Sequence, residues 1–154
     1  MKSMFYYETI IGKVAIAENG TAITELHLKA GEDISQSADI IETPLLKKAN
    51  QELQEYLSGK RKEFDLPLAP QGTEFQQKVW KELRKIPYGR TCSYKDIAEN
   101  IGNKKACRAV GMANNRNPIP IFIPCHRVIG ADGSLVGYGG GLGIKEKLLE
   151  IEKS

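Results

Sequence analysis

Cys125 and His126 are adjacent in the sequence, and a thiol beside an imidazole can do nucleophilic chemistry. The pair follows a short apolar run at 119–123, and prolines at positions 120 and 124 restrict the backbone there. A thiol with a pKa of about 8.5 is mostly protonated at neutral pH, so a nucleophilic cysteine needs help from a neighbouring group. The segment therefore predicts a rigidly held nucleophile with a histidine to activate it.

The contact between the two side chains does not follow from their adjacency. Consecutive residues of an extended segment point to opposite faces, so a bridging water would relieve the geometry. An acid beyond the histidine would hold its tautomer, and Glu152 is one candidate that spacing alone does not select. From these residues alone, a buried and inert Cys125 stays an open alternative.

Metal binding is a weaker explanation for the cysteines and histidines. A structural zinc usually has four ligands in paired spacings, and this chain has no C-x-x-C or H-x-x-x-H motif. We expect Cys92 and Cys107 to behave as small apolar residues and His27 to be structural. The sequence thus predicts no metal and no cofactor.

The composition predicts a folded, intracellular chain. Its 154 residues are 41% hydrophobic, which suffices for a buried core in one ordinary domain or two small ones. No apolar run approaches the roughly 20 residues of a membrane helix, and the N-terminus does not resemble a signal peptide. Three cysteines are too few for a disulfide framework, and an odd number cannot all form pairs within one chain. We therefore expect a cytoplasmic protein with no membrane partner.

Positive charge is concentrated in the middle of the chain. Residues 78–130 contain eleven Lys or Arg and three acids, so this segment carries 11 − 3 = +8 while the whole chain carries +3. Such asymmetry favours contact with a polyanion, although a solvated basic surface would also explain it.

The first part of the chain reads as a small α+β domain. Strands are expected at 4–10, 13–18 and 21–28, with a hairpin turn at Asn19-Gly20. Thr43 and Pro44 begin a helix that ends at Gly59. Two prolines in the following charged segment mark a linker, which places the domains at 1–66 and 67–154.

The second part reads as helical, with a helix-turn-helix. Thr73 and Gln76 can form a capping box for its first helix. Two short helices follow, at 94–101 and at about 104–115, joined by a turn at Gly102. The second has a face of small residues and a basic remainder, which suits contact with phosphates better than a bland exposed helix. A last helix is expected from Ile144 to about Glu152, burying Ile144, Leu148 and Ile151.

A glycine-rich loop at 137–141 surrounds Tyr138. Glycines allow a close approach of the backbone, and the tyrosine ring offers a surface on which a base can stack. A plain flexible loop is the alternative.

Several ordered blocks from Thr73 to Glu152 together resemble the O6-alkylguanine-DNA alkyltransferases, the suicide DNA-repair proteins. The blocks are Ser93-Tyr94, Arg108-Ala109-Val110-Gly111, Asn117-Pro118, Pro124-Cys125-His126-Arg127-Val128, Gly137-Tyr138 and the final helix. The resemblance implies a ribonuclease-H-like N-terminal domain with a three-stranded sheet, followed by a winged helix-turn-helix domain.

The resemblance also implies a role for each matching residue. The thiolate of Cys125 would attack the alkyl carbon, with His126 as base through a water, Glu152 orienting it and Asn117 bracing the turn. Arg108 would fill the gap left by a flipped guanine, and Tyr94 would rotate the 3′ phosphate and protonate the leaving base. The remaining DNA contacts would be Lys104, Lys105, Ala106, Ala109 and Arg116, and the pocket would include Val128, Tyr138 and Gly139.

The implied partner is double-stranded DNA that contains O6-alkylguanine, with O4-alkylthymine as a further substrate to test. We expect a monomer, with DNA able to bring several copies together. Some relatives have serine in place of Gly139, but the role there is that of a backbone N–H. Some larger relatives hold zinc in the N-terminal part, and the cysteines for it are absent here.

Three other functions compete with this one. An alkyltransferase-like protein binds alkylated DNA without reacting, but it typically has tryptophan in place of Cys125. A winged-helix regulator would explain the basic helix and leave the Cys-His pair without a purpose. A cysteine hydrolase would need an oxyanion site and would turn over repeatedly.

Overall fold

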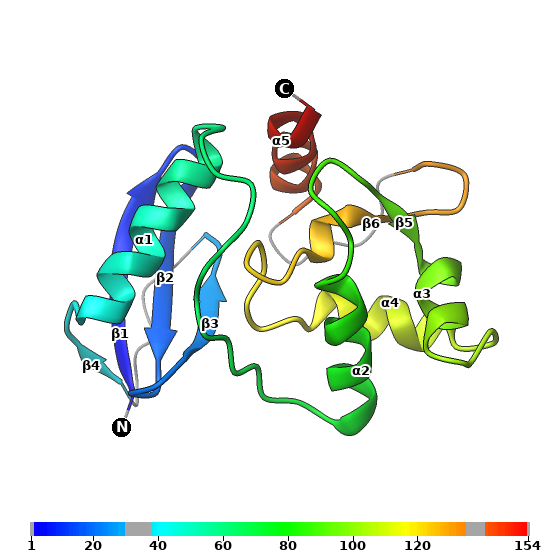
Figure 1. Ribbon diagram of the computed structural model, residues 1–154, viewed down its shortest axis with the longest axis horizontal. Helices are drawn as coiled ribbons and strands as arrows, with labels where there is room; N and C mark the ends of the chain where they lie inside the picture. The colour runs from blue at the N-terminus through cyan, green and yellow to red at the C-terminus, as the bar shows by residue number, and fades with distance from the viewer. Residues whose placement is uncertain (1, 30–37, 135–140, 154) are drawn as a thin grey trace. The chain divides into compact units, whose positions relative to one another are not determined.

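The structure, a computed structural model, describes residues 2–29, 38–134 and 141–153. The chain forms two compact units, Met1–Gln71 and Gly72–Ser154 (Figure 1). The first contains a sheet and one helix, and the second contains the other helices and the Cys-His pair. None of the helices in the described ranges combines the length and apolarity that crossing a membrane requires.

The sheet of the first unit has four strands in the order β3-β2-β1-β4. They are β1 (Ser3–Thr9), β2 (Gly12–Glu18), β3 (Ile23–His27) and β4 (Asp39–Ile40). The first three pair antiparallel, and Gly20, in the turn between β2 and β3, has a φ of 102°. The expected three-stranded sheet is therefore incomplete. The parallel strand β4 was missed because two exposed residues are too short to show an alternating pattern.

Helix α1 (Pro44–Leu57) packs against β1 and β2 (Figure 1). Thr43 caps it, since its hydroxyl accepts a hydrogen bond from the backbone N–H of Leu46 at 3.2 Å. The apolar side chains that the helix buries are Leu46, Ala49, Leu53, Tyr56 and Leu57. This expected amphipathic helix closes the core of the first unit.

The first unit continues past the boundary expected after residue 66. Backbone hydrogen bonds of 2.8 Å join Ile23 N–H to the Pro67 carbonyl and Ala69 N–H to the Ile23 carbonyl. This short segment thus lines up beside β3 although it contains prolines, because Pro67 takes part through its carbonyl. The two units therefore divide between Gln71 and Gly72.

The second unit begins with α2 (Glu74–Leu83), whose capping box between Thr73 and Gln76 is present. Trp80 is 2% exposed, and its Nε1 donates a 2.9 Å hydrogen bond to the carbonyl of Ala113. The only tryptophan of the chain thus anchors the core of the second unit.

Two short helices, α3 (Tyr94–Asn100) and α4 (Cys107–Asn115), form the helix-turn-helix. Gly102 has a φ of 82° in the turn between them. The second helix begins later than expected, because the turn continues through Lys104 and Lys105 to a hydrogen bond from Ala106 N–H to the Asn103 carbonyl. No side chain caps α4, so the start of this helix had no local signal.

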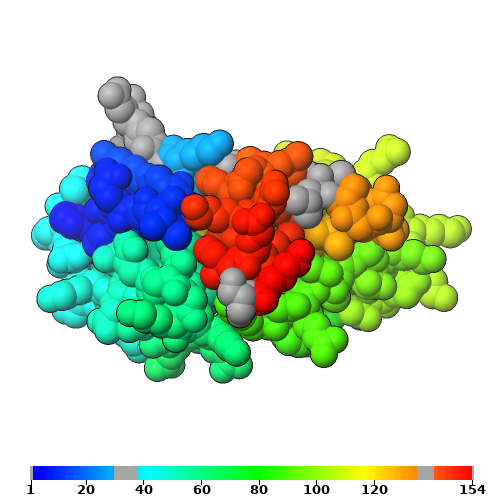
Figure 2. Space-filling view, turned by 90° about the horizontal axis from the view of Figure 1, so that it is seen from above, coloured from blue at the N-terminus to red at the C-terminus, as the bar shows by residue number. Residues whose placement is uncertain are grey.

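The remaining elements bring the ends of this unit together. A one-turn 3₁₀ helix, η1 (Cys125–Arg127), leads into β6 (Val128–Ile129), which pairs parallel with β5 (Cys92–Ser93). Helix α5 (Leu142–Lys153) packs against η1, and its outer side is seen in red in Figure 2. The Cys-His pair therefore lies where α5, η1 and the small sheet converge.

Candidate active site

The segment that carries Cys125 is a tight turn. Pro124 has φ −79° and ψ 66°, the values of an inverse γ-turn, and Cys125 N–H donates to the Ile123 carbonyl at 2.8 Å. The next three residues form the turn of 3₁₀ helix, so the extended backbone expected at this position is wrong. A residue upstream of the turn stabilises it by hydrogen bonds, and the residues next to Cys125 in the sequence do not indicate these bonds.

Asn117 supplies those contacts. Its Nδ2 donates to the Ile123 carbonyl at 2.8 Å, and its Oδ1 accepts from Ile119 N–H at 3.0 Å. Between these two points, Ile121 has a φ of 75°, a left-handed conformation that strains a β-branched residue. Asn117 thus holds together the strained loop that precedes the cysteine.

His126 and Glu152 are in contact inside the second unit. His126 is fully buried, and its Nε2 lies 2.7 Å from Glu152 Oε2. A carboxylate only accepts hydrogen bonds, so Nε2 carries the proton and Nδ1 carries the lone pair of the neutral imidazole. Burial lowers the pKa of His126, against the opposing effect of the hydrogen bond that its Nε2 donates to Glu152 and of the carboxylate charge. The imidazole is therefore neutral at neutral pH, as a proton acceptor must be.

Arg127 binds the same carboxylate from the other side. Its Nε lies 2.9 Å from Glu152 Oε1, its Nη2 donates to Oε2 at 3.0 Å, and its Nη1 donates to the Ile86 carbonyl at 2.6 Å. The guanidinium thus offsets the charge of a nearly buried carboxylate. Arg127 was not among the predicted site residues, although it stands inside the Pro-Cys-His-Arg-Val segment.

Lys145 is a second buried cation beside the cysteine. It is 0% exposed, and its Nζ donates to the Val128 carbonyl at 2.6 Å. Burial lowers its pKa, and the nearby Cys125 thiolate acts in the opposite direction. Lys145 was also missed, because a lysine in an exposed-looking helix gives no sequence signal that it points inward.

Tyr94, the first residue of α3, also faces the cysteine. Burial is the main cause that raises the pKa of its half-buried phenol, and the charge of Cys125 adds to it. A hydrogen bond from the side chain of Asn114 lowers the pKa in part. The structure thus gathers Tyr94, Cys125 and His126 with Glu152 and Asn117 around one turn.

The expected DNA contacts lie on or next to α4. Lys104, Lys105, Arg108, Ala109 and Arg116 are exposed, whereas Ala106 is only 9% exposed. Met112, on the exposed side of the same helix, is 55% exposed. The outer face of α4 therefore combines small residues, one large apolar residue and cations.

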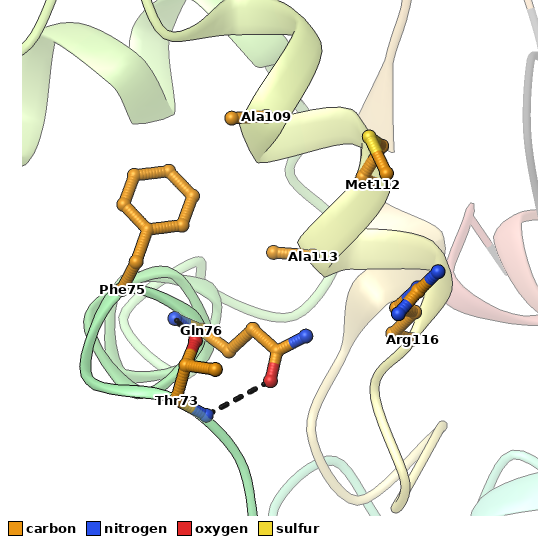
Figure 3. Close-up of a pocket in the computed structure, with 7 residues that line it drawn as sticks. All are labelled: Thr73, Phe75, Gln76, Ala109, Met112, Ala113 and Arg116. Carbon is orange, nitrogen blue, oxygen red and sulfur yellow. Dashed lines mark hydrogen bonds between the residues drawn. The ribbon is translucent and has the colours of Figure 1, made fainter.

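A shallow hollow of about 180 Å³ lies between the start of α2 and the end of α4 (Figure 3). It is lined by Thr73, Phe75, Gln76, Ala109, Met112, Ala113 and Arg116. Neither Cys125 nor His126 lines it, so it belongs to the helical surface and not to the thiol site.

Two expected pocket residues, Tyr138 and Gly139, lie outside the described residues, while Val128 is fully buried next to η1. In the part of the chain that the structure covers, no three His, Cys, Asp or Glu side chains are grouped to hold a metal ion.

The fold and the site define a helix-turn-helix protein with a buried cysteine beside a neutral histidine and its carboxylate. Two family models match the sequence. The 6-O-methylguanine DNA methyltransferase DNA-binding domain covers residues 74–154, and the ribonuclease-like domain of the same family covers residues 4–70. The chain belongs to the 6-O-methylguanine DNA methyltransferase family, which confirms the resemblance and the α+β fold.

Relatives match over nearly their full length. A Methanosarcina barkeri protein named methylated-DNA–protein-cysteine methyltransferase is 52% identical, over 97% of this chain and 98% of its own. The constitutive Bacillus subtilis protein of that name is 50% identical, over 97% and 96%. Among solved structures, Mycobacterium tuberculosis OGT in complex with DNA superposes with a TM-score of 0.90 at 45% identity, covering 98% of this chain and 92% of that one.

Proposed function

We propose that this protein repairs DNA by moving the alkyl group of O6-alkylguanine onto Sγ of Cys125. The observation that carries the proposal is the contact of 2.7 Å between Glu152 and His126, which makes the neighbouring imidazole a proton acceptor beside a buried thiol. Membership of the 6-O-methylguanine DNA methyltransferase family supports the choice of substrate.

In the proposed reaction, His126 removes the proton of the Cys125 thiol through a water. The thiolate then attacks the alkyl carbon, so that the C–S bond forms while the C–O6 bond breaks and its electron pair passes to the guanine. Tyr94 gives its hydroxyl proton to a ring nitrogen of the leaving guanine and recovers a proton from the imidazolium through solvent. Glu152 stabilises the positive charge on His126 in the meantime.

DNA would be bound in the minor groove by the outer face of α4. The exposed Ala109 permits a close approach, Arg108 fills the space of the flipped base, and Lys104, Lys105 and Arg116 meet phosphates. Tyr94 turns the 3′ phosphate, while Val128, Tyr138 and Gly139 border the pocket. Flipping costs a few kcal/mol, and less for a damaged pair.

The product would be a thioether, which is a very poor leaving group at carbon. We therefore propose one repair event per molecule, carried out by a monomer that DNA can bring together with further copies. The free state of Cys92, Cys107 and Cys125 supports a reducing compartment, the cytoplasm.

The intact mass of the protein after incubation with duplex DNA containing O6-methylguanine tests the proposal. We expect a gain of one methyl group, located on Cys125 by peptide mapping, and no turnover beyond one equivalent. Cys125→Ala should gain nothing, whereas Cys92→Ala should react as the wild type does. No gain in the wild type, or repeated turnover, would contradict the proposal and favour an alkyltransferase-like protein, a regulator or a hydrolase. The same assay with duplex DNA that contains O4-methylthymine tests whether this base is also a substrate.

A further inference from the structure

We propose that Asn114 is a positioning residue, which holds the Tyr94 hydroxyl and the Cys125 carbonyl with the two protons of one amide group. This inference rests on the proposed function, since it assigns work to Asn114 within that reaction. Asn114 is the last but one residue of α4, and it is one of the few polar side chains buried in the second unit.

The contact with Cys125 fixes the orientation of the amide. Asn114 is 1% exposed, and its Nδ2 lies 3.3 Å from the Cys125 carbonyl oxygen. A carbonyl only accepts hydrogen bonds, so the nitrogen end of the amide must face it. Among the described residues, Oδ1 of this buried amide has no hydrogen-bond partner. A buried polar atom left unmatched is costly, so the favourable contacts of this amide are those of its nitrogen end.

The contact with Tyr94 uses the second proton of the amide. Burial and the charge of Cys125 raise the pKa of the Tyr94 phenol, whereas the hydrogen bond with Asn114 lowers it. Because Oδ1 of Asn114 has no hydrogen-bond partner among the described residues, the amide meets the phenol oxygen through Nδ2, which can only donate. A donated bond stabilises the phenolate, which agrees with the lowering effect on the pKa of Tyr94.

The two contacts of Asn114 correspond to two requirements of the proposed reaction. These are proton donation by Tyr94 and recognition of the guanine by the Cys125 carbonyl. Tyr94 has to give up its proton to the leaving guanine, and an N–H that already points at its oxygen stabilises the phenolate that results. The family resemblance implies that the Cys125 carbonyl also accepts from the exocyclic amine of guanine, and Asn114 Nδ2 and the Val128 N–H, which both donate to this oxygen, fix its direction. Lys145 holds the Val128 carbonyl in the same way, at 2.6 Å.

The same substitution is therefore predicted to disturb base recognition and proton donation together. Asn114→Leu keeps a similar volume and removes both donated protons. Single-turnover transfer is measured for the wild type, Asn114→Leu, Tyr94→Phe and the double variant. The two duplexes contain O6-methylguanine or O6-methylhypoxanthine, which lacks the exocyclic amine. Asn50→Leu, on α1 of the other unit, is the matched control and should react as the wild type does.

We expect Asn114→Leu to slow transfer from O6-methylguanine at least threefold more than transfer from O6-methylhypoxanthine. We also expect Tyr94→Phe to slow the wild type at least threefold more than it slows the Asn114→Leu protein, because the effects of residues in one hydrogen-bond network are not additive. Equal slowing on both duplexes with independent effects of the two substitutions would mean that Asn114 only fills space, and would overturn the inference.

A variant that does not fold and a wild type that does not react can both be distinguished from a failure of the inference about Asn114. If Asn114→Leu does not fold, Asn114→Asp keeps the shape while losing both donated protons, and the same two comparisons apply to it. If the wild type transfers no methyl group to Cys125, the proposed function fails. If the wild type reacts and the Asn114 variants match it, only the inference about Asn114 fails.

Discussion

Glu152 Oε2 lies 2.7 Å from Nε2 of His126, although 26 positions separate the two residues in the chain. The carboxylate is nearly buried, and the guanidinium of Arg127 binds it on the other side. Glu152 therefore has two partners, since it holds the imidazole that we propose activates the thiol and it neutralises a buried cation. Removing its charge should affect stability and reaction together.

Glu152→Gln should lower both the free energy of unfolding and the rate of transfer. Breaking a buried ion pair while leaving one partner charged costs about 3 kcal/mol, which urea denaturation would measure. Transfer should slow by about 10²-fold, because His126 accelerates the reaction as a general base only when its imidazole is held in the correct orientation. The matched control is Glu146→Gln on the exposed side of α5, for which both quantities should stay near wild type. An unchanged rate in Glu152→Gln would separate Glu152 from the chemistry.

The lowered pKa of His126 predicts a pH dependence with a definite sign. Its unfolded pKa is about 6.5 and its folded pKa is lower, so between these values the unfolded chain binds more protons. The contribution of His126 to stability is thus complete above about pH 6.5 and is lost as the pH falls through the folded pKa. Urea midpoints from pH 8 to pH 5 should show this loss in the wild type and in His27→Gln. His126→Gln should lack this component, and an identical slope in that variant would contradict the prediction.

Lys145→Met should reduce the reactivity of Cys125. The buried ammonium lies close enough to the cysteine for their charges to interact, and a nearby cation favours the thiolate. We expect alkylation of Cys125 by iodoacetamide at pH 7 to slow by about tenfold, which corresponds to one pKa unit. Lys147→Met, on the exposed side of α5, is the control. If both variants react at the wild-type rate, Lys145 does not act on the thiol.

Arg108→Ala should weaken repair in duplex DNA more than transfer from the free base. Arg108 is exposed on α4, where it is proposed to occupy the space of the flipped guanine. We expect transfer from duplex to fall about tenfold, equivalent to about 1.4 kcal/mol of the flipping energy, while transfer from free O6-alkylguanine stays within about twofold. The free base is the internal control, and equal losses on both substrates would remove this role from Arg108.

The helix starts were predictable because their signals are local. Thr43, Thr73 and Ser93 each accept a hydrogen bond from a backbone N–H three residues later, so one short stretch of sequence contains the whole cap. The start of α4 lacks such a cap, and it was placed too early. Strand β4 depends on a partner more than thirty residues away, so its two residues had no pattern of their own.

The inward face of α5 shows why part of the site escaped prediction. Hydrophobic spacing favoured Ile144, Leu148 and Ile151, but the buried side chains are Lys145, Leu148 and Glu152, and the two isoleucines are half-buried. The helix turns polar residues inward because a carbonyl, a histidine and an arginine in the core bind them. Spacing rules assume an apolar interior, so they misplace the face of a helix that completes a polar site.

The distance along the chain between His126 and Glu152 also matters while the protein is being synthesised. The ribosome makes about 5–20 residues per second, so it needs roughly 1–5 s to extend the nascent chain across the 26 positions that separate them. During that interval Cys125 has no activated histidine beside it and Arg127 has no carboxylate to bind. The thiol that we propose to react only once is thus joined by its complete set of neighbours only after Glu152 has been added to the chain.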